Sequence, residues 1–206
     1  MRTSVYVDGC NLYYGALKGT AYKWLDLERL MQVLLPFNEV TAIKFFTARV
    51  RGRPQDPASP ERQNVYLRAL EAHCPTVEII HGYFLIHHIR MPLSHPPEEG
   101  RKTVDVVQTT EKRSDVNLAV SLVDDAWRDR YDTAVVVSND SDLAFGLERA
   151  RALGKTIGLI TPTQRRASKQ LAEHADFRKA LRANHLTQAQ LPKTIPGTKL
   201  TRPDGW

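Results

Sequence analysis

The feature that most constrains this chain is a series of short, continuous apolar runs that alternate with helical patterns. The runs are rich in β-branched residues and are continuous rather than alternating, which is typical of strands buried on both faces of a sheet. Buried strands are therefore expected at Ser4–Val7, Val40–Phe46, Val77–Ile80, Thr133–Val137 and Thr156–Ile160.

Amphipathic stretches fill the intervals between these strands. The first begins with a capping Asp26 and stops before Pro36, and the last is closed by Gly154. Strands that alternate with helices in this way form a mostly parallel sheet with right-handed crossovers. The sequence therefore predicts a three-layer, Rossmann-like α/β domain with a mostly parallel five-stranded sheet. Its helices are expected at Asp26–Leu35, Pro60–His73, Ser114–Trp127 and Ser141–Leu153.

Three segments depart from this alternation. Arg49–Pro60 is rich in Pro and Arg and is expected to be a loop, as is Pro92–Gly100. Between them, Gly82–Arg90 could extend a strand or form a hairpin. The domain is expected to occupy residues 1–186. Residues 187–206 contain three prolines and little periodicity, which predicts a partly disordered tail.

Composition narrows the classes of protein to consider. In 206 residues, 29 Lys and Arg exceed 23 Asp and Glu by six, and this basic balance favours polyanionic partners such as nucleic acid. Two cysteines are too few for a disulfide scaffold. The N-terminus does not resemble a signal peptide, and no apolar run approaches the ~18 residues of a spanning helix. We expect a cytoplasmic protein, and a homo-oligomer stays open.

Acidic residues follow two of the expected strands. Asp8 ends the first strand, and Asp140 and Asp142 follow the strand at Thr133–Val137. Asp115 opens the preceding helix. Since sites in open parallel sheets form beyond the carboxyl ends of the strands, these acids are expected at one edge of the sheet. Clustered carboxylates are the ligands of hard divalent cations such as Mg²⁺.

Each acid alone has a simpler explanation. Asp140 can be a helix N-cap, and Asp142 and Asp115 can be first-turn acids that favour the helix dipole. Three separate segments bringing acids to one edge favour a metal site. Cys10 lies beside Asp8, but no base can be placed for it, so a buried or oxidisable thiol is favoured over a nucleophile.

Three motifs resemble a known family. Val7-Asp8-Gly9-Cys10-Asn11-Leu12 resembles the V-D-G-x-N-L opening of the NYN domain, the LabA-like branch of the PIN-like nuclease superfamily. The segment 111–119 (EKRSDVNLA) is similar to the family's E-K-G-x-D-V-x-L-A helix start. The segment 137–142 (VSNDSD) is similar to its v-S-x-D-S-D motif. The motifs occur in family order, and the resemblance covers roughly residues 1–175.

The resemblance implies a parallel sheet between helices, and an acidic pocket that binds Mg²⁺ or Mn²⁺ and cleaves RNA. The family's catalytic and metal-binding acids correspond to Asp8, Asp115, Asp140 and Asp142. The substrate-binding and supporting residues that it implies are Asn11, Arg113, Ser138 and Asn139. Arg113 departs from the family, which often has Gly there, and its cation could hold a phosphate or a substrate carboxylate.

The resemblance leaves two alternatives to a ribonuclease. Some family members from bacterial nicotine catabolism are described as NADH-dependent 6-hydroxy-3-succinoylpyridine monooxygenases, which implies a pyridine substrate with NADH and FAD as cofactors. No G-x-G-x-x-G motif follows the first strand, because Gly9 and Gly15 are wrongly spaced for a dinucleotide fingerprint. The other alternative is a non-catalytic RNA-binding regulatory module.

Basic and aromatic residues are candidates for RNA contacts. Cations in loops after strands lie on the same rim as the acids and can hold a phosphate backbone. Tyr13 and Tyr14 can stack on a base or pack in the core. The cations fall into three sets, of which the last is expected on a C-terminal helix: Arg49, Arg51 and Arg53; Arg165, Arg166 and Lys169; Arg178, Lys179 and Arg182.

Overall fold

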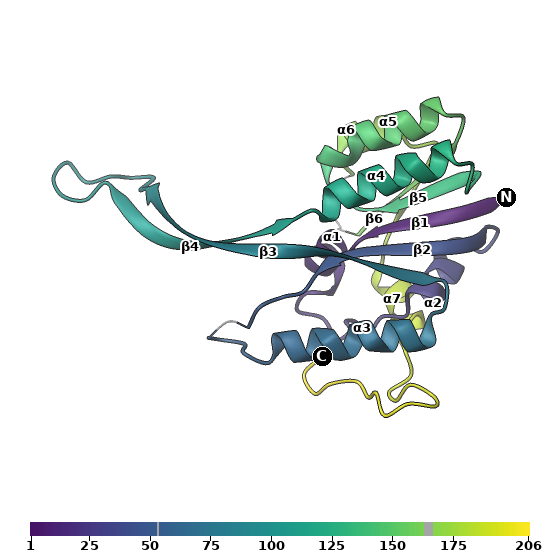
Figure 1. Cartoon of the computed structure of the whole chain (residues 1–206), viewed down its shortest axis with the longest axis horizontal. Helices are drawn as coiled ribbons and strands as arrows, with labels where there is room; N and C mark the ends of the chain where they lie inside the picture. Colours follow the sequence, from purple (N-terminus) through teal and green to yellow (C-terminus); the bar gives the residue numbers. More distant parts are fainter. Residues whose placement is uncertain (53, 163–166) are drawn as a thin grey trace.

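A seven-stranded sheet lies between two layers of helices in the computed structural model, which describes residues 1–52, 54–162 and 167–206 (Figure 1). The strand order is β4-β3-β2-β1-β5-β6-β7, and only the β3–β4 pair is antiparallel among these neighbours. The predicted three-layer α/β class is confirmed. The strands are β1 (Arg2–Asp8), β2 (Glu39–Ala48), β3 (Val77–Pro92), β4 (Thr103–Lys112), β5 (Thr133–Val137), β6 (Thr156–Thr161) and β7 (Phe177–Ala180).

The helices divide between the two faces of the sheet. Alternate side chains of β1 show the division: Val5 and Val7 join the core under α2, α3 and α7, whereas Tyr6 joins the core under α4, α5 and α6. The helical segments are α1 (Gly9–Leu12), the π-helical turn η1 (Tyr13–Leu17), α2 (Leu27–Leu34), α3 (Ser59–His73), α4 (Ser114–Trp127), the 3₁₀ turn η2 (Ser141–Leu143), α5 (Ala144–Ala152), α6 (Lys169–Glu173) and α7 (Ala183–Gln188). The four predicted helices correspond to α2, α3, α4 and η2 with α5.

The prediction of five strands was wrong, because the sheet also contains β4 and β7. Most of β4 is exposed, and β7 is a four-residue edge strand with one half-buried and three exposed side chains. Neither strand is buried on both faces, so neither carries the apolar run that marks β1, β5 and β6. Arg178 and Lys179 consequently lie on β7, where the sequence had predicted a helix. The strand expected at Val77–Ile80 begins β3, but it is half-buried there and Glu78 is exposed.

The strands β3 and β4 form a long hairpin that extends away from the helical layers (Figure 1). Their pairing runs from Tyr83 opposite Lys112 to Pro92 opposite Thr103. Both interpretations of Gly82–Arg90 therefore hold, because this segment extends β3 and forms one side of the hairpin. The second strand of the hairpin, β4, ends at Lys112, and α4 begins two residues later at Ser114. The base of the hairpin is therefore joined to the helix that carries the predicted site residue Asp115.

The segment after residue 187 packs against the domain. Leu191 and Ile195 are buried in the same core as α2 and α3. The indole N–H of Trp24 donates a 2.9 Å hydrogen bond to the carbonyl of Pro192. The ring of Trp206 lies 5.7 Å from that of Tyr66 in α3. Widely spaced apolar residues make these contacts, and such spacing gives no periodic signal in the sequence.

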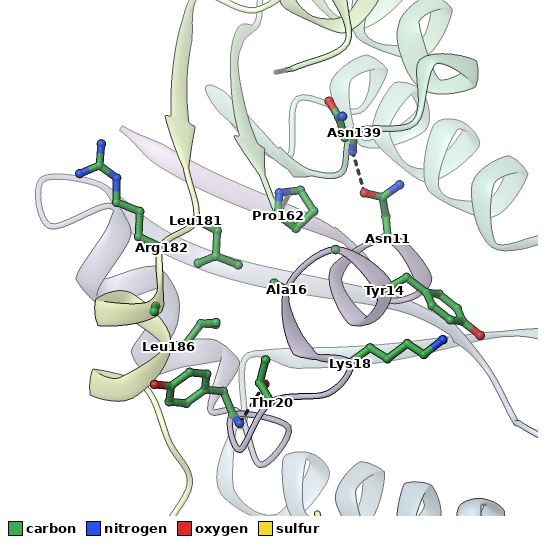
Figure 2. A pocket seen from close by; sticks show the side chains of 13 residues that line it. Asn11, Tyr14, Ala16, Lys18, Thr20, Asn139, Pro162, Leu181, Arg182 and Leu186 are labelled. Carbon is green, nitrogen blue, oxygen red and sulfur yellow. Dashed lines mark hydrogen bonds between the residues drawn. The ribbon is translucent and has the colours of Figure 1, made fainter. Parts of the chain in front are cut away.

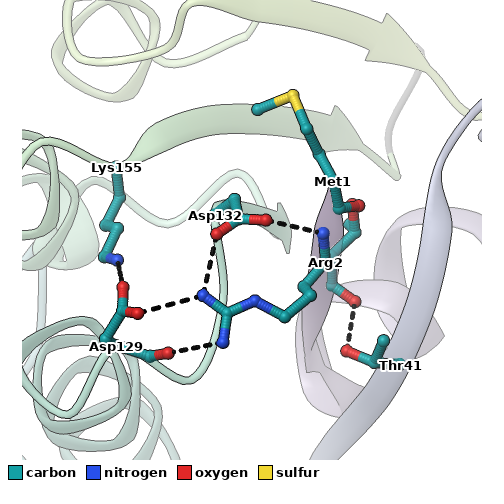
Figure 3. Close-up of polar contacts among 7 residues, drawn as sticks. Met1, Arg2, Thr41, Asp129, Asp132 and Lys155 are labelled. Atoms are coloured by element: carbon teal, nitrogen blue, oxygen red, sulfur yellow. Dashed lines mark hydrogen bonds and ion pairs between the residues drawn. The ribbon is translucent and has the colours of Figure 1, made fainter.

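A cluster of ion pairs lies at the edge of the sheet where β1 begins (Figure 3). The guanidinium of Arg2 contacts Asp132 at 2.8 Å and Asp129 at 3.1 Å, and Lys155 also pairs with Asp129. These contacts hold the pKa values of both aspartates below their ordinary values, mainly through hydrogen bonds from Lys155 and Arg2. Among the described residues, the acids at the other end of β1 form no ion pair with a Lys or Arg.

Within the described residues, no helix combines the length and the apolar character needed to cross a lipid bilayer.

Candidate functional site

Three carboxylates meet at the carboxyl edge of the sheet. Asp8 is the last residue of β1, Asp140 follows the neighbouring strand β5, and Asp115 lies in the first turn of α4. One oxygen from each side chain lies within 4.8 Å of the other two. The parallel register of β1 and β5 brings the first two acids together, because both strands end at the same edge. We call these three residues the acidic triad.

Hydrogen bonds fix the position of Asp8, which is only 3% exposed. Its Oδ1 accepts the backbone N–H of Asn11 at 2.9 Å, which caps α1, and its Oδ2 accepts the hydroxyl of Ser138 at 2.8 Å. The same Ser138 hydroxyl oxygen accepts the backbone N–H of Asp140 at 3.1 Å. Ser138 therefore links two members of the triad.

Asn11 and Asn139 connect the loops that carry the triad. The Oδ1 atom of Asn11 accepts the backbone N–H of Asn139 at 3.0 Å. The Oδ1 atom of Asn139 in turn accepts the backbone N–H of Ser168 at 2.7 Å. These side chains lie next to the triad, as the sequence predicts, and their amide oxygens hold three segments of the chain in register.

Glu111 is a site residue that the sequence interpretation did not single out. Its Oε1 accepts the hydroxyl of Ser114 at 2.7 Å and the backbone N–H of Ser114 at 3.3 Å, at the start of α4. The carboxylate packs against Gly82, where an added Cβ would lie 2.4 Å from Oε1. The signal was available in the sequence, since Glu111 opens the motif that contains Asp115 and stands three residues before the helix begins.

The triad carries negative charge that no cation of the described residues pairs with. Among the described residues, no Lys or Arg forms an ion pair with Asp8, Asp115 or Asp140. Burial, followed by repulsion from Asp8 and Asp140, raises the pKa of Asp115 to about 6. Burial also raises the pKa of Asp8, against the effect of its hydrogen bonds. Three uncompensated carboxylates this close together fit a divalent cation.

Two predicted site residues lie outside the triad. Asp142 is exposed on η2, and its backbone N–H donates a 3.0 Å hydrogen bond to Oδ1 of Asp140. Arg113 immediately precedes α4 with a left-handed φ of 82°, and its guanidinium carbon lies 4.8 Å from the centre of the Tyr83 ring. The backbone N–H of Asp142 thus holds the Asp140 carboxylate in place. The side chain of Arg113 packs on Tyr83 at the base of the hairpin.

The thiol of Cys10 is a poor nucleophile in this setting. Burial, and then the charges of Asp8, Glu111 and Asp115, raise its pKa to about 12. The thiol therefore stays protonated at neutral pH, and only the thiolate is strongly nucleophilic. This agrees with the interpretation of Cys10 as a buried or oxidisable thiol.

The aromatic candidates for RNA contacts are exposed. Tyr13 and Tyr14 are 38% and 59% exposed, and their rings meet edge to face at 5.2 Å, so they are not part of the core. Three of the basic candidates, Arg53, Arg165 and Arg166, lie outside the described residues.

The fold and the triad define a three-layer α/β protein with a candidate metal centre at the carboxyl edge of its sheet. The family model of the NYN domain matches residues 2–180, and the chain belongs to this family. The predicted resemblance is confirmed.

Two individual proteins are similar to the chain. Over its whole length it aligns at 35% identity, across 238 aligned positions and 75% of the relative, with a Pseudomonas putida (strain DSM 28022 / S16) protein named 6-hydroxy-3-succinoylpyridine 3-monooxygenase HspA. A crystal structure of a protein of unknown function from Vibrio parahaemolyticus RIMD 2210633 superposes with a TM-score of 0.55 at 18% identity. That match covers 92% of this chain and 96% of the other, and it bears on the fold alone.

Proposed function

We propose that the protein is a divalent-metal-dependent ribonuclease that hydrolyses phosphodiester bonds in RNA. The observation that carries this proposal is the acidic triad, in which oxygens from three separate segments lie within 4.8 Å of one another. Mg²⁺ and Mn²⁺ are the ions that all-carboxylate sites favour. Membership of the NYN family supports the same chemistry.

The residues around the triad have distinct roles in this proposal. When bound, a divalent ion would lower the pKa of an attacking water and stabilise negative charge on the phosphate oxygens. Asp8 is held for this role by Asn11 and Ser138, and Asp140 by the cap of η2. We assign Asp142 an electrostatic role at the rim, because its charge adds to those that raise the pKa of Asp115.

Cleavage of a labelled single-stranded RNA in Mn²⁺ tests the proposal. The Asp140→Asn variant keeps an oxygen that can accept the Asp142 N–H but loses its charge, so we expect a folded protein whose cleavage rate falls by at least ~100-fold. EDTA should abolish cleavage by the wild type. Asp105→Asn, a matched change on the exposed hairpin, should cleave like the wild type. Full cleavage by Asp140→Asn would overturn the assignment.

The second candidate is an NADH-dependent, flavin-using monooxygenase that acts on 6-hydroxy-3-succinoylpyridine. The full-length similarity to the Pseudomonas putida protein supports it. The local structure after β1 does not favour a dinucleotide site. At Gly9 an added Cβ would lie 2.6 Å from the carbonyl oxygen of Phe46, so the absence of a side chain lets the start of α1 pack closely against β2. The α-helix that follows has four residues and continues as the π-helical turn η1.

A simple pair of measurements separates this candidate from the ribonuclease. A monooxygenase of this kind would bind flavin and would consume NADH only when the pyridine substrate is present, because the cofactors carry that chemistry. Substrate-dependent NADH loss without RNA cleavage would replace the ribonuclease with the oxidoreductase. Salt-sensitive RNA binding with neither activity would favour the non-catalytic RNA-binding module.

A further inference from the structure

A cavity of about 800 Å³ lies beside the acidic triad, between η1 with the loop after it and the β7–α7 connection (Figure 2). Asn11 and Asn139 line the cavity, and Asn11 is also the residue whose backbone N–H holds Asp8. Asn11 therefore connects the cavity to the triad. Its volume lies within the range of sites that bind small organic ligands.

The lining of this cavity combines an apolar floor with cations at the sides. Pro162, Leu181 and Leu186 line the floor. Arg182 stands on one side, whereas Lys18 and Tyr14 lie on the opposite side (Figure 2). The Lys18 ammonium lies 5.1 Å from the centre of the Tyr14 ring.

The charge of the cavity is opposite to that of the triad. None of its lining residues within the described part of the chain is acidic. Neither Lys18 nor Arg182 forms an ion pair with a described carboxylate. The pKa of His185, next to the cavity in α7, is lowered by burial and then by the charges of Arg182 and Lys179. The local potential is therefore positive, which favours an anionic ligand.

We propose that this cavity binds a nucleotide of single-stranded RNA next to the one whose phosphodiester bond lies at the acidic triad. This inference rests on the proposed ribonuclease function. The base would lie on the apolar floor, and the adjoining phosphate would be held by Arg182 or Lys18. Sites for single-stranded nucleic acid combine flat apolar or aromatic platforms with a cationic track in this way. A paired base cannot reach the floor without leaving its helix, so the cavity selects unpaired RNA.

The proposal also gives the positive cavity a role in binding. The triad repels phosphate oxygens, so a substrate needs favourable charge elsewhere along its backbone. Arg182 and Lys18 provide that charge at the two sides of the cavity, within a chain whose net charge is +6. The cavity thus accounts for binding of RNA beside a site that is itself acidic.

Binding of a fluorescein-labelled hexauridylate to the full chain in EDTA tests this site without cleavage. We expect Arg182→Ala to weaken binding at least ~10-fold, and Ala16→Phe, which fills the cavity from η1, to do the same. Arg101→Ala removes the same charge from the distant hairpin loop and should change binding less than ~2-fold. Uridine monophosphate should compete better than uridine or inorganic phosphate, and single-stranded RNA better than its duplex.

The outcomes separate this proposal from the ribonuclease proposal. RNA binding that depends on Arg182 and Ala16, without cleavage in Mn²⁺, would support the cavity and overturn the ribonuclease. Cleavage by the wild type, with both cavity variants binding RNA like the wild type, would overturn the cavity and leave the ribonuclease standing. Equal weakening by Arg101→Ala and Arg182→Ala would also overturn the cavity, because only the overall charge would then matter.

Discussion

The backbone N–H of Asn139 donates a 3.0 Å hydrogen bond to Oδ1 of Asn11, which joins the loop after β5 to the helix after β1. The backbone N–H of Asn11 also holds Oδ1 of Asp8, and Asn139 is the immediate neighbour of Asp140. This amide side chain therefore helps Ser138 to hold Asp8 and Asp140 close together. The geometry of the triad depends on this link as well as on the carboxylates themselves.

Replacing Asn11 with Ala should destabilise the protein by about 1–3 kcal/mol, because the Asn139 N–H loses this acceptor in a partly buried loop. Urea unfolding monitored by circular dichroism measures the change. Asn184→Ala, on the exposed side of α7, is the matched control and should shift stability by less than about 0.5 kcal/mol. Equal unfolding free energies for wild type and Asn11→Ala would contradict this role.

The sequence predicts the buried part of the fold well, for a physical reason. Strands covered on both faces need apolar runs, so β1, β5, β6 and the second half of β2 are visible in the sequence. The first part of β3 is also apolar, although it is only half-buried. The hairpin strand β4 and the edge strand β7 are largely exposed, so they do not need apolar runs and the sequence pattern does not reveal them.

The candidate site is predictable from the sequence only in part. The carboxyl ends of β1 and β5 bring Asp8 and Asp140 together, because adjacent parallel strands end at the same edge of the sheet. The contact between Asn11 and Asn139 joins residues 128 positions apart and depends on the exact register of two strands. The packing of Glu111 against Gly82 likewise depends on the antiparallel register of the hairpin. A local sequence pattern cannot predict contacts between residues that lie so far apart along the chain.

The raised pKa of Asp115 predicts how stability depends on pH. Its pKa is about 6 in the folded protein and 3.8 when unperturbed, so the folded state binds more protons between these values. This residue therefore makes the metal-free protein less stable as pH rises from 4 to 6, and the full penalty remains above pH 6. Asp115→Asn removes the penalty.

Urea unfolding in EDTA at two pH values tests this prediction. At pH 7.5, Asp115→Asn should be more stable than the wild type, whereas at pH 3.5 the two proteins should have nearly equal stability. A variant that is destabilised to the same extent at both pH values would show that the carboxylate is stabilising, which contradicts the account.

Gly82 should not tolerate a side chain. A Cβ at this position would lie 2.5 Å from the carbonyl oxygen of Lys112 and 2.7 Å from Oγ of Ser114, at the start of α4. Gly82→Ala should therefore cost about 1–3 kcal/mol and displace the helix that carries Asp115. Gly146→Ala in α5 is a suitable control, since its Cβ would make ordinary contacts with Ala119 and Leu122 of α4. A Gly82→Ala protein as stable as this control would refute the close packing.

Two substitutions at Arg113 separate backbone strain from side-chain function. The residue has a φ of 82°, a conformation that Gly adopts readily and that costs other residues about 1 kcal/mol. Arg113→Gly should thus be more stable than Arg113→Ala by about that amount, although both lose the contact with Tyr83. Thermal unfolding of the two variants measures the difference. An Ala variant at least as stable as the Gly variant would contradict the strain.

The central claim is that the acidic triad holds a divalent cation, and a calorimetric titration of the metal-free protein with Mn²⁺ at pH 7.5 tests it most directly. We predict that the wild type and Asp105→Asn bind Mn²⁺ equally well, and that Asp8→Asn and Asp140→Asn bind it at least ~10-fold more weakly. Equal Mn²⁺ affinity in all four proteins would contradict the claim.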